Sequence, residues 1–120
     1  MRPISQDSWV MCRTQFEGFH CWPDAPDEVE FLRTRHRHMF HVELHVPVTH
    51  ADRDVEFILL KRALEAELAS WGAEQGVGSC EMMAKRIIRW AVEHTGQMGT
   101  YFCDVTEDGE NGARQIEMWA

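Results

Sequence analysis

The sequence predicts an α+β fold in which two pairs of antiparallel strands flank two helices. Near the N-terminus, two long segments alternate apolar and polar side chains, the pattern of a strand with one buried face. In the middle of the chain, apolar residues recur every three or four positions, the pattern of an amphipathic helix. Alternation then returns near the C-terminus. We therefore expect the order β-β-α-α-β-β, with one four-stranded antiparallel sheet and both helices on one face.

The first two strands are predicted over residues 8–20 and 34–48. The more apolar face of the first strand runs down to its last residue, His20. The segment 21–28 contains two prolines and three acidic residues, which favours a loop over a helix or a strand. Strands that one loop joins in this way pair as antiparallel neighbours. We therefore expect the end of the first strand to lie beside the start of the second.

The two helices are predicted over 55–72 and over 80–94, with Ser79 as the N-cap of the second. Glycines separate the two helices and follow the second one. The first helix presents one apolar face, formed by Phe57, Leu60, Leu64, Leu68 and Trp71. The second helix presents a face formed by Met83, Ile87, Trp90 and His94.

The last two strands are predicted over 100–106 and 113–119, joined by an acidic turn that is rich in glycine. The chain, residues 1–120, has the length of a single domain with one core. It contains no internal repeat and no low-complexity segment.

The charge of the chain argues against nucleic acid as a partner. Its net charge is −8, whereas surfaces that bind polyanions carry an excess of Lys and Arg. Arg33, Arg35 and Arg37 are a local exception, and their alternation fits either a small basic patch or a solvated strand face. No segment approaches the ~20 apolar residues that span a bilayer, and no signal-peptide pattern opens the sequence. We therefore expect a cytoplasmic protein without a membrane partner.

The four cysteines do not indicate a disulfide framework. Cys12, Cys21, Cys80 and Cys103 include no Cys-x-x-Cys pair. Cys12 and Cys103 lie in predicted strands among apolar neighbours, so we expect both to be small buried side chains. This use of cysteine fits a reducing compartment.

Three histidines are the strongest functional signal in the sequence. Residues i and i+2 of a strand share a face, so His36 and His38 point the same way. Antiparallel pairing places His20 beside them, with cross-strand Cβ atoms roughly 5 Å apart. Three imidazoles without a fourth protein ligand are typical of a zinc site that keeps one position open. The other interpretation is that these are ordinary histidines of half-buried strands, since the chain contains four more.

Five motifs follow one another along the chain. Phe16–His20 ends the first strand, His36–His38 opens the second, Asp54–Lys61 and Ser79–Ala84 start the helices, and Glu107 follows the third strand. In this order and on these elements, they resemble the 6-pyruvoyl-tetrahydropterin synthase and 6-carboxy-tetrahydropterin synthase family of the tunnelling fold. His36–His38 resembles the family's His-Gly-His motif, with Arg in place of Gly. Glu107 stands where the family places the carboxylate that binds the amino-pyrimidine edge of the pterin.

The resemblance covers roughly residues 9–119 and implies the tunnelling fold, with a homo-oligomer such as a trimer or hexamer. It implies a zinc-dependent carbon–oxygen lyase with His20, His36 and His38 as the zinc ligands. The implied substrate is dihydroneopterin triphosphate or a related pterin or purine, in pterin or 7-deazaguanine synthesis. Glu107 also fits a plain acidic turn. The residues that the resemblance implies for substrate binding are Ser79, Cys80, Glu81 and Glu107.

Two parts of the family's acid–base apparatus are missing from this sequence. The family has a cysteine shortly before His-x-His, but residues 28–35 contain none. Glu30 is the candidate replacement as a catalytic base, unless it is a solvated loop acid. The family's Asp-His pair between the two helices is absent from residues 68–76. Two alternatives therefore stand beside the enzyme: a module that binds a pterin, purine or nucleotide without turnover, and a structural subunit without a ligand.

Overall fold

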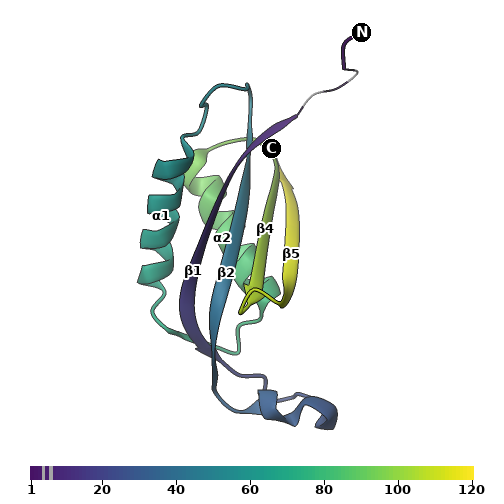
Figure 1. Cartoon of the computed structure of the whole chain (residues 1–120), viewed down its shortest axis with the longest axis vertical. Helices are drawn as coiled ribbons and strands as arrows, with labels where there is room; N and C mark the ends of the chain where they lie inside the picture. The colour runs from purple at the N-terminus through teal and green to yellow at the C-terminus, as the bar shows by residue number, and fades with distance from the viewer. Residues whose placement is uncertain (4, 6) are drawn as a thin grey trace.

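The computed structural model describes residues 1–3, 5 and 7–120, and contains one mixed five-stranded sheet with two α-helices (Figure 1). The strands lie in the order β3-β1-β2-β4-β5. All neighbours are antiparallel except β1 and β3. The α+β fold is confirmed, but the prediction of four strands, all antiparallel, is wrong. The elements are β1 (Ser8–His20), the 3-10 helix η1 (Asp27–Arg33), β2 (His36–Val48), α1 (Phe57–Ser70), β3 (Glu74–Gly76), α2 (Cys80–Thr95), β4 (Gly99–Glu107) and β5 (Asn111–Trp119).

The two long strands β1 and β2 pair over their whole length, as the alternation in the sequence predicts. Ser8 lies opposite Val48 at one end, and His20 lies opposite His36 at the other. The second strand begins at His36 rather than at residue 34, because β1 has already ended and offers earlier residues no partner. The connecting segment extends beyond the body of the sheet and contains η1, where we predicted only a loop (Figure 1).

Strand β3 was not predicted from the sequence. It has only three residues, too few to show a period, and it pairs in parallel with the end of β1. Backbone bonds hold it there: the Phe19 amide donates to the Ala73 carbonyl at 2.8 Å, and the Cys21 amide to the Gly76 carbonyl at 2.9 Å. The linker between the helices is thus an edge strand that borders the end of β1.

Both helices bury one face against the same side of the sheet. On α1, Leu60, Leu64 and Leu68 are buried, whereas Phe57 at its start is 55% exposed. On α2, Ser79 is the N-cap, as predicted, and its hydroxyl accepts from the Met82 amide. The predicted helix faces are therefore correct except for Phe57 and for His94, whose side chain is also exposed.

Among the residues that the structure describes, no helix has both the length and the apolarity to cross a membrane.

The core lies between this side of the sheet and the helices. β2 contributes every second residue from Phe40 to Val46, and β4 contributes Tyr101, Cys103 and Val105. Cys12 and Cys103 are buried, as predicted, and burial raises the pKa of the Cys12 thiol to about 11.

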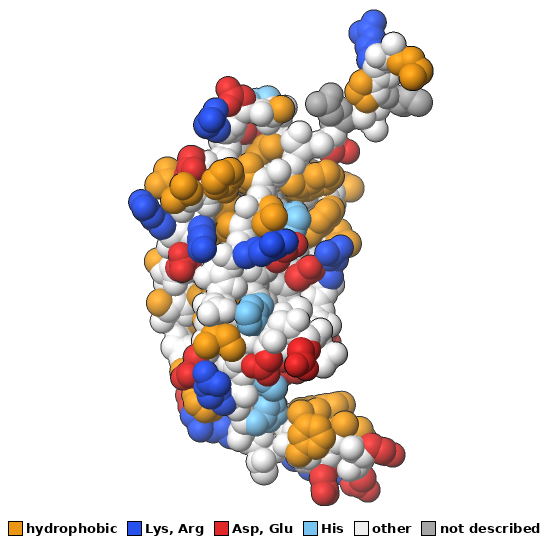
Figure 2. Space-filling model, in the orientation of Figure 1, with side chains coloured by type: hydrophobic (Ala, Val, Ile, Leu, Met, Phe, Trp, Pro, Cys, Tyr) orange, Lys and Arg blue, Asp and Glu red, His pale blue; other side chains and the backbone are white. Residues whose placement is uncertain are grey.

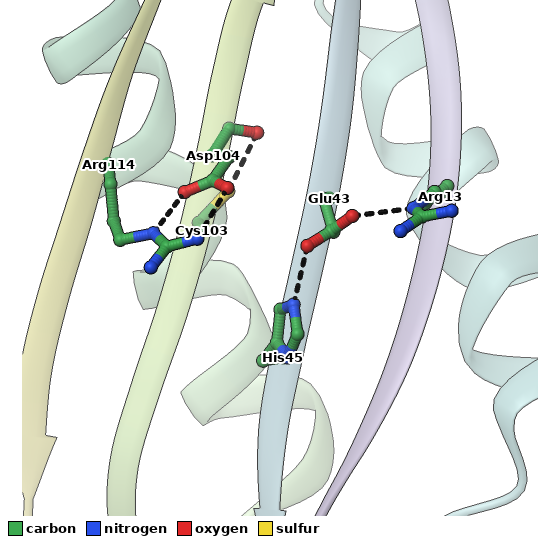
Figure 3. Close-up of polar contacts among 6 residues, drawn as sticks. All are labelled: Arg13, Glu43, His45, Cys103, Asp104 and Arg114. Carbon is green, nitrogen blue, oxygen red and sulfur yellow. Dashed lines mark hydrogen bonds and ion pairs between the residues drawn. The ribbon is translucent and has the colours of Figure 1, made fainter.

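Within the described residues, no helix covers the opposite face of the sheet, and we call it the open face. Charged side chains form a ladder across its middle (Figure 3). Arg13 on β1 donates to Glu43 on β2 at 2.5 Å, and Glu43 also contacts His45 at 2.7 Å. On the neighbouring pair of strands, Arg114 donates to Asp104 at 2.7 Å.

The three arginines near the start of β2 are paired with acids rather than gathered into a basic patch. Arg33 contacts Asp27 at 2.6 Å, and Arg37 contacts Glu17 at 2.8 Å. Arg35 forms an ion pair with a glutamate of β3 and covers the ring of Phe19. These contacts fit the interpretation of a solvated face with alternating charge.

Candidate metal centre

The ends of β1 and β2 bring three histidines together. His20 is the last residue of β1, and the register of the strand pair sets it directly opposite His36. His38 lies two residues further along β2 on the same face. The ring centroids are 4.6 Å apart for His20 and His36, 5.0 Å for His36 and His38, and 5.3 Å for His20 and His38. The planes of each pair are steeply inclined, so the rings meet edge to face rather than stacking.

Each of the three rings is oriented through its Nδ1 atom. The partners are two backbone carbonyls and, for His38, a carboxylate, all of which accept, so each Nδ1 atom carries the proton. This leaves the Nε2 atom of each ring with a free lone pair, the form that binds metals. The contacts are His20 Nδ1 to Gly78 O at 2.8 Å, His36 Nδ1 to Thr34 O at 2.8 Å, and His38 Nδ1 to Asp108 Oδ2 at 2.7 Å.

The three Nε2 atoms are fully buried, and none has a hydrogen-bond partner. A buried polar atom without a partner costs about 1–3 kcal/mol, and three such atoms at one place are unusual. They have almost no solvent-accessible surface, and no donor in the described part of the chain satisfies them. A metal ion would satisfy all three lone pairs at once, so the residues present fit a metal centre.

Glu107, at the end of β4, adds a carboxylate to the cluster. Its Oε2 lies 2.9 Å from Nε2 of His20 and 3.3 Å from Nε2 of His38, without the geometry of a hydrogen bond. The four potential ligand atoms of His20, His36, His38 and Glu107 all lie within 4.8 Å of one another. Two ligands of a tetrahedral zinc ion lie about 3.4 Å apart, given bonds near 2.1 Å. Three imidazoles and one carboxylate form a donor set that suits zinc, and also iron or manganese.

A pocket of about 520 Å³ opens beside the histidines. The predicted ligand-binding residues Ser79, Cys80 and Glu81, at the start of α2, line it together with Glu107. The structure thus brings all four to one cavity next to the candidate metal centre. The apolar part of the wall is formed by Trp22, Leu32, Val77 and Met82.

The structure places Cys80 in the wall of the pocket and Glu30 outside it. Burial raises the pKa of the Cys80 thiol to about 12, and the neighbouring carboxylates of Glu107 and Glu81 add to this shift. Cys80 is therefore a neutral thiol near pH 7, suited to a weak hydrogen bond rather than to attack as a thiolate. Glu30 lies on η1 with an exposed side chain and does not line the pocket, so its catalytic role stays a prediction.

Sequence reasoning missed the partners that orient the histidines. The Gly78 and Thr34 carbonyls are backbone groups, which leave no side-chain signature. The sequence indicates only an acidic turn at Asp108, and either a ligand anchor or the start of that turn at Glu107. The pairing of Phe40 with Glu107 across β2 and β4 brings both carboxylates to the histidines. The register of distant strands was the information needed, and alternation alone does not supply it.

A scan against protein-family models finds no match to this chain, and a search of curated proteins finds none either. The functional interpretation therefore rests on the geometry of the metal centre and its pocket, together with the motifs of the sequence.

Proposed function

We propose that the chain is a zinc-dependent carbon–oxygen lyase of the tunnelling fold that acts on a pterin-like or purine-like substrate. The observation that carries this proposal is the convergence of three buried, unpartnered Nε2 atoms beside a pocket. The motif order that resembles the tetrahydropterin synthases supports the same reaction. Dihydroneopterin triphosphate or a related compound is the proposed substrate, in pterin or 7-deazaguanine synthesis.

His20, His36 and His38 would hold the zinc ion, with Glu107 as a fourth ligand. Lewis-acid polarisation of a substrate oxygen is the chemistry that zinc supplies in such a site. Both histidine contacts of Glu107 use Oε2, which leaves Oε1 to accept a hydrogen bond from a ring N–H of the substrate. Glu107 could therefore bind the metal through Oε2 and the substrate ring through Oε1.

The remaining pocket residues would bind and orient the ring. The apolar side chains of Trp22, Leu32 and Met82 provide walls for a flat heterocycle and exclude water from it. The Ser79 hydroxyl accepts from the Met82 amide, so its own proton is free to be donated into the pocket. Glu81 supplies a second carboxylate at the rim.

A homo-oligomer is part of this proposal. β5 is the last strand of the sheet, and an unpaired edge strand favours pairing with another chain. Exposed apolar side chains on the open face lie near the start of β1 and the end of β5, where Figure 2 shows hydrophobic side chains gathered. These residues are Trp9, Met11, Ile116 and Met118.

The second candidate function is a metal-containing module that binds the same class of ring without turnover. Glu107 favours it, because a fourth protein ligand would leave a tetrahedral zinc ion without the open position that a substrate oxygen needs. The exposed position of Glu30 also favours it, because no carboxylate base is then supplied by η1.

Metal analysis tests the proposal directly. Protein prepared without chelator should contain about one zinc ion per chain, the stoichiometry of a single mononuclear site. Replacement of His20, His36 and His38 by Ala should abolish it, whereas replacement of the exposed His50 and His94 should not. Equal zinc content in the triple variant and the parent would refute the metal centre.

Activity and binding assays then separate the two candidate functions. Turnover of dihydroneopterin triphosphate that is lost on metal removal and returns with zinc supports the lyase. A ligand-dependent rise in melting temperature without turnover supports the binding module. Glu107→Gln should weaken ring binding by about 1.5–3 kcal/mol, the worth of a hydrogen bond to a charged group. It should also lower zinc affinity if Oε2 is a ligand, whereas unchanged zinc affinity would leave Glu107 as a ring anchor only.

A further inference from the structure

We propose that Asp108 is the positioning residue of the metal centre: its carboxylate holds His38 in the one tautomer and orientation that leaves Nε2 free for a metal. This inference rests on the metal centre proposed above. Asp108 lies just after β4, in the turn to β5, and it belongs to neither the ligand set nor the pocket wall.

The Asp108 carboxylate makes two contacts with neighbouring groups of β2. Oδ2 lies 2.7 Å from Nδ1 of His38, and Oδ1 accepts from the Met39 amide at 3.0 Å. The Asp108 amide in turn donates to the Met39 carbonyl at 2.8 Å. The residue is therefore held at three atoms, and its carboxylate has little freedom to leave the imidazole.

The backbone conformation of Asp108 explains how it reaches the histidine. Consecutive residues of a strand point to opposite faces, so a carboxylate after Glu107 should point away from the cluster. Asp108 instead has φ +57°, in the left-handed region, which interrupts the alternation. Glu107 and Asp108 thus contact the two nitrogens of the same imidazole, at 3.3 Å and 2.7 Å respectively. A non-glycine residue pays about 1 kcal/mol or more for this conformation.

Asp108 differs from the groups that orient the other two histidines. His20 and His36 are oriented by backbone carbonyls, which no substitution at Gly78 or Thr34 would remove. Asp108 is the one side chain among the three partners, and it also brings a negative charge toward the cation. Carboxylate partners of this kind raise the basicity of a metal-binding imidazole and fix its ring.

The matched variant is Asp108→Asn, which has nearly the same shape but only one acceptor oxygen. If that oxygen keeps its bond to the Met39 amide, the NH2 group faces Nδ1 of His38 and donates to it. Nδ1 must then accept, so the proton moves to Nε2, the atom that faces the metal. Asp108→Gly is the second variant, because glycine keeps the left-handed backbone without strain and removes the carboxylate altogether.

The experiment measures zinc affinity by competition with a chromophoric chelator. Both Asp108 variants should bind zinc about 10- to 100-fold more weakly than the parent, the usual loss when such a partner is removed. Two controls should bind zinc as the parent does. Glu110→Gln removes a charge from the same turn, and Arg53→Gly introduces glycine at the other described non-glycine residue with positive φ.

A second readout separates positioning from folding. Nitrogen NMR of the histidine rings in the metal-free protein should report the Nδ1–H tautomer of His38 in the parent and its loss in Asp108→Asn. The signals of His20 and His36 should stay unchanged in that variant. Circular dichroism of each metal-free variant verifies that the fold is intact.

The outcomes distinguish this inference from the proposal on which it rests. A parent protein that binds no zinc overturns both. A parent that binds zinc, with both Asp108 variants binding equally well, overturns the role of Asp108 alone. Weaker binding in the variants with an unchanged His38 tautomer in Asp108→Asn also overturns it, because the loss would then come from charge and not from positioning.

Discussion

At the residue scale, close packing around the histidines depends on a glycine. A Cβ atom on Gly18 would lie 2.8 Å from Cε2 of Phe40, closer than such atoms approach in proteins. The Phe40 ring is fully buried, and its centroid lies 5.2 Å from that of His20 and 5.7 Å from that of His38. Because residue 18 has no side chain, the Phe40 ring can pack closely against His20 and His38.

We expect Gly18→Ala to destabilise the protein by about 1–3 kcal/mol, the usual cost of overpacking a core. Denaturant unfolding of the metal-free protein measures this change. The double variant Gly18→Ala/Phe40→Leu should be less destabilised than the two single changes added together, because the smaller side chain relieves the overlap. Strict additivity of the two changes would contradict a direct clash between residues 18 and 40.

At the element scale, the short strand β3 secures the end of β1. The Gly76 carbonyl accepts from the Cys21 amide, next to His20, and the Gly78 carbonyl accepts from the His20 ring. Gly76 has φ +58°, in the left-handed region that favours glycine. A three-residue strand without a side-chain pattern therefore has a role in placing a candidate metal ligand.

The variant Gly76→Ala tests this role, because an added Cβ meets no atom within 4 Å and the cost is one of backbone strain alone. We expect a loss of stability of about 1 kcal/mol and a several-fold weaker zinc affinity. Gly72→Ala is the matched control, since Gly72 also has positive φ and open space but lies outside β3. It should lose similar stability and keep the zinc affinity of the parent. Equal zinc affinities in both variants would show that β3 does not position His20.

The charged ladder on the open face makes stability depend on pH. The hydrogen bond from His45, and then that from Arg13, holds the pKa of Glu43 below its ordinary value of 4.5. A depressed pKa in the folded state means that the unfolded chain binds the proton more readily. The contribution of Glu43 is therefore present above about pH 4.5 and is lost as the pH falls through the lower, folded value.

Glu43→Gln should accordingly be less stable than the parent at pH 7, and the difference should shrink in acid. Unfolding free energies measured from pH 7 down to pH 3 verify this. Glu28→Gln, at an exposed position of η1, should show no such convergence with the parent. A difference between Glu43→Gln and the parent that stays constant into acid would argue against a stabilising role for the ionised carboxylate.

At the scale of the whole molecule, the open face and the β5 edge determine whether the chain assembles. Ile116 and Met118 are 56% and 81% exposed on the edge strand β5, and the exposed Trp9 and Met11 lie on the same face of β1, with β2 and β4 between the two strands. Apolar side chains gathered on one face typically mark a contact surface. An interface between chains at the open face and the β5 edge would also cover the unpaired backbone groups of β5.

We expect light scattering to report a trimer or hexamer at micromolar concentration. The double variant Ile116→Lys/Met118→Lys should lower this mass, because two buried charges oppose the interface. Leu59→Lys, at an exposed position of α1, should leave the mass unchanged. A monomeric parent protein would contradict the proposed assembly.

The sequence by itself determined the four long strands, the two α-helices and most of the side chains that face the core. The alternation of β1 and β2 placed His20 opposite His36, and the apolar neighbours of Cys12 and Cys103 indicated burial. These features are local: the period of a segment sets which side chains share a face, and one short connection sets which strands pair. The tunnelling fold and the reaction stay predictions that rest on resemblance.

The tertiary structure decided which distant groups meet those faces. Strand β3 exists because backbone groups at 73–76 pair with β1, and backbone groups carry no residue-specific pattern. Glu107 and Asp108 reach His38 because β4 pairs with β2 in a particular register and because one residue adopts a left-handed conformation. The left-handed conformation is local to the turn, where Gly109 also has positive φ, but the register depends on contacts between segments about seventy positions apart. No local period in the sequence encodes such contacts.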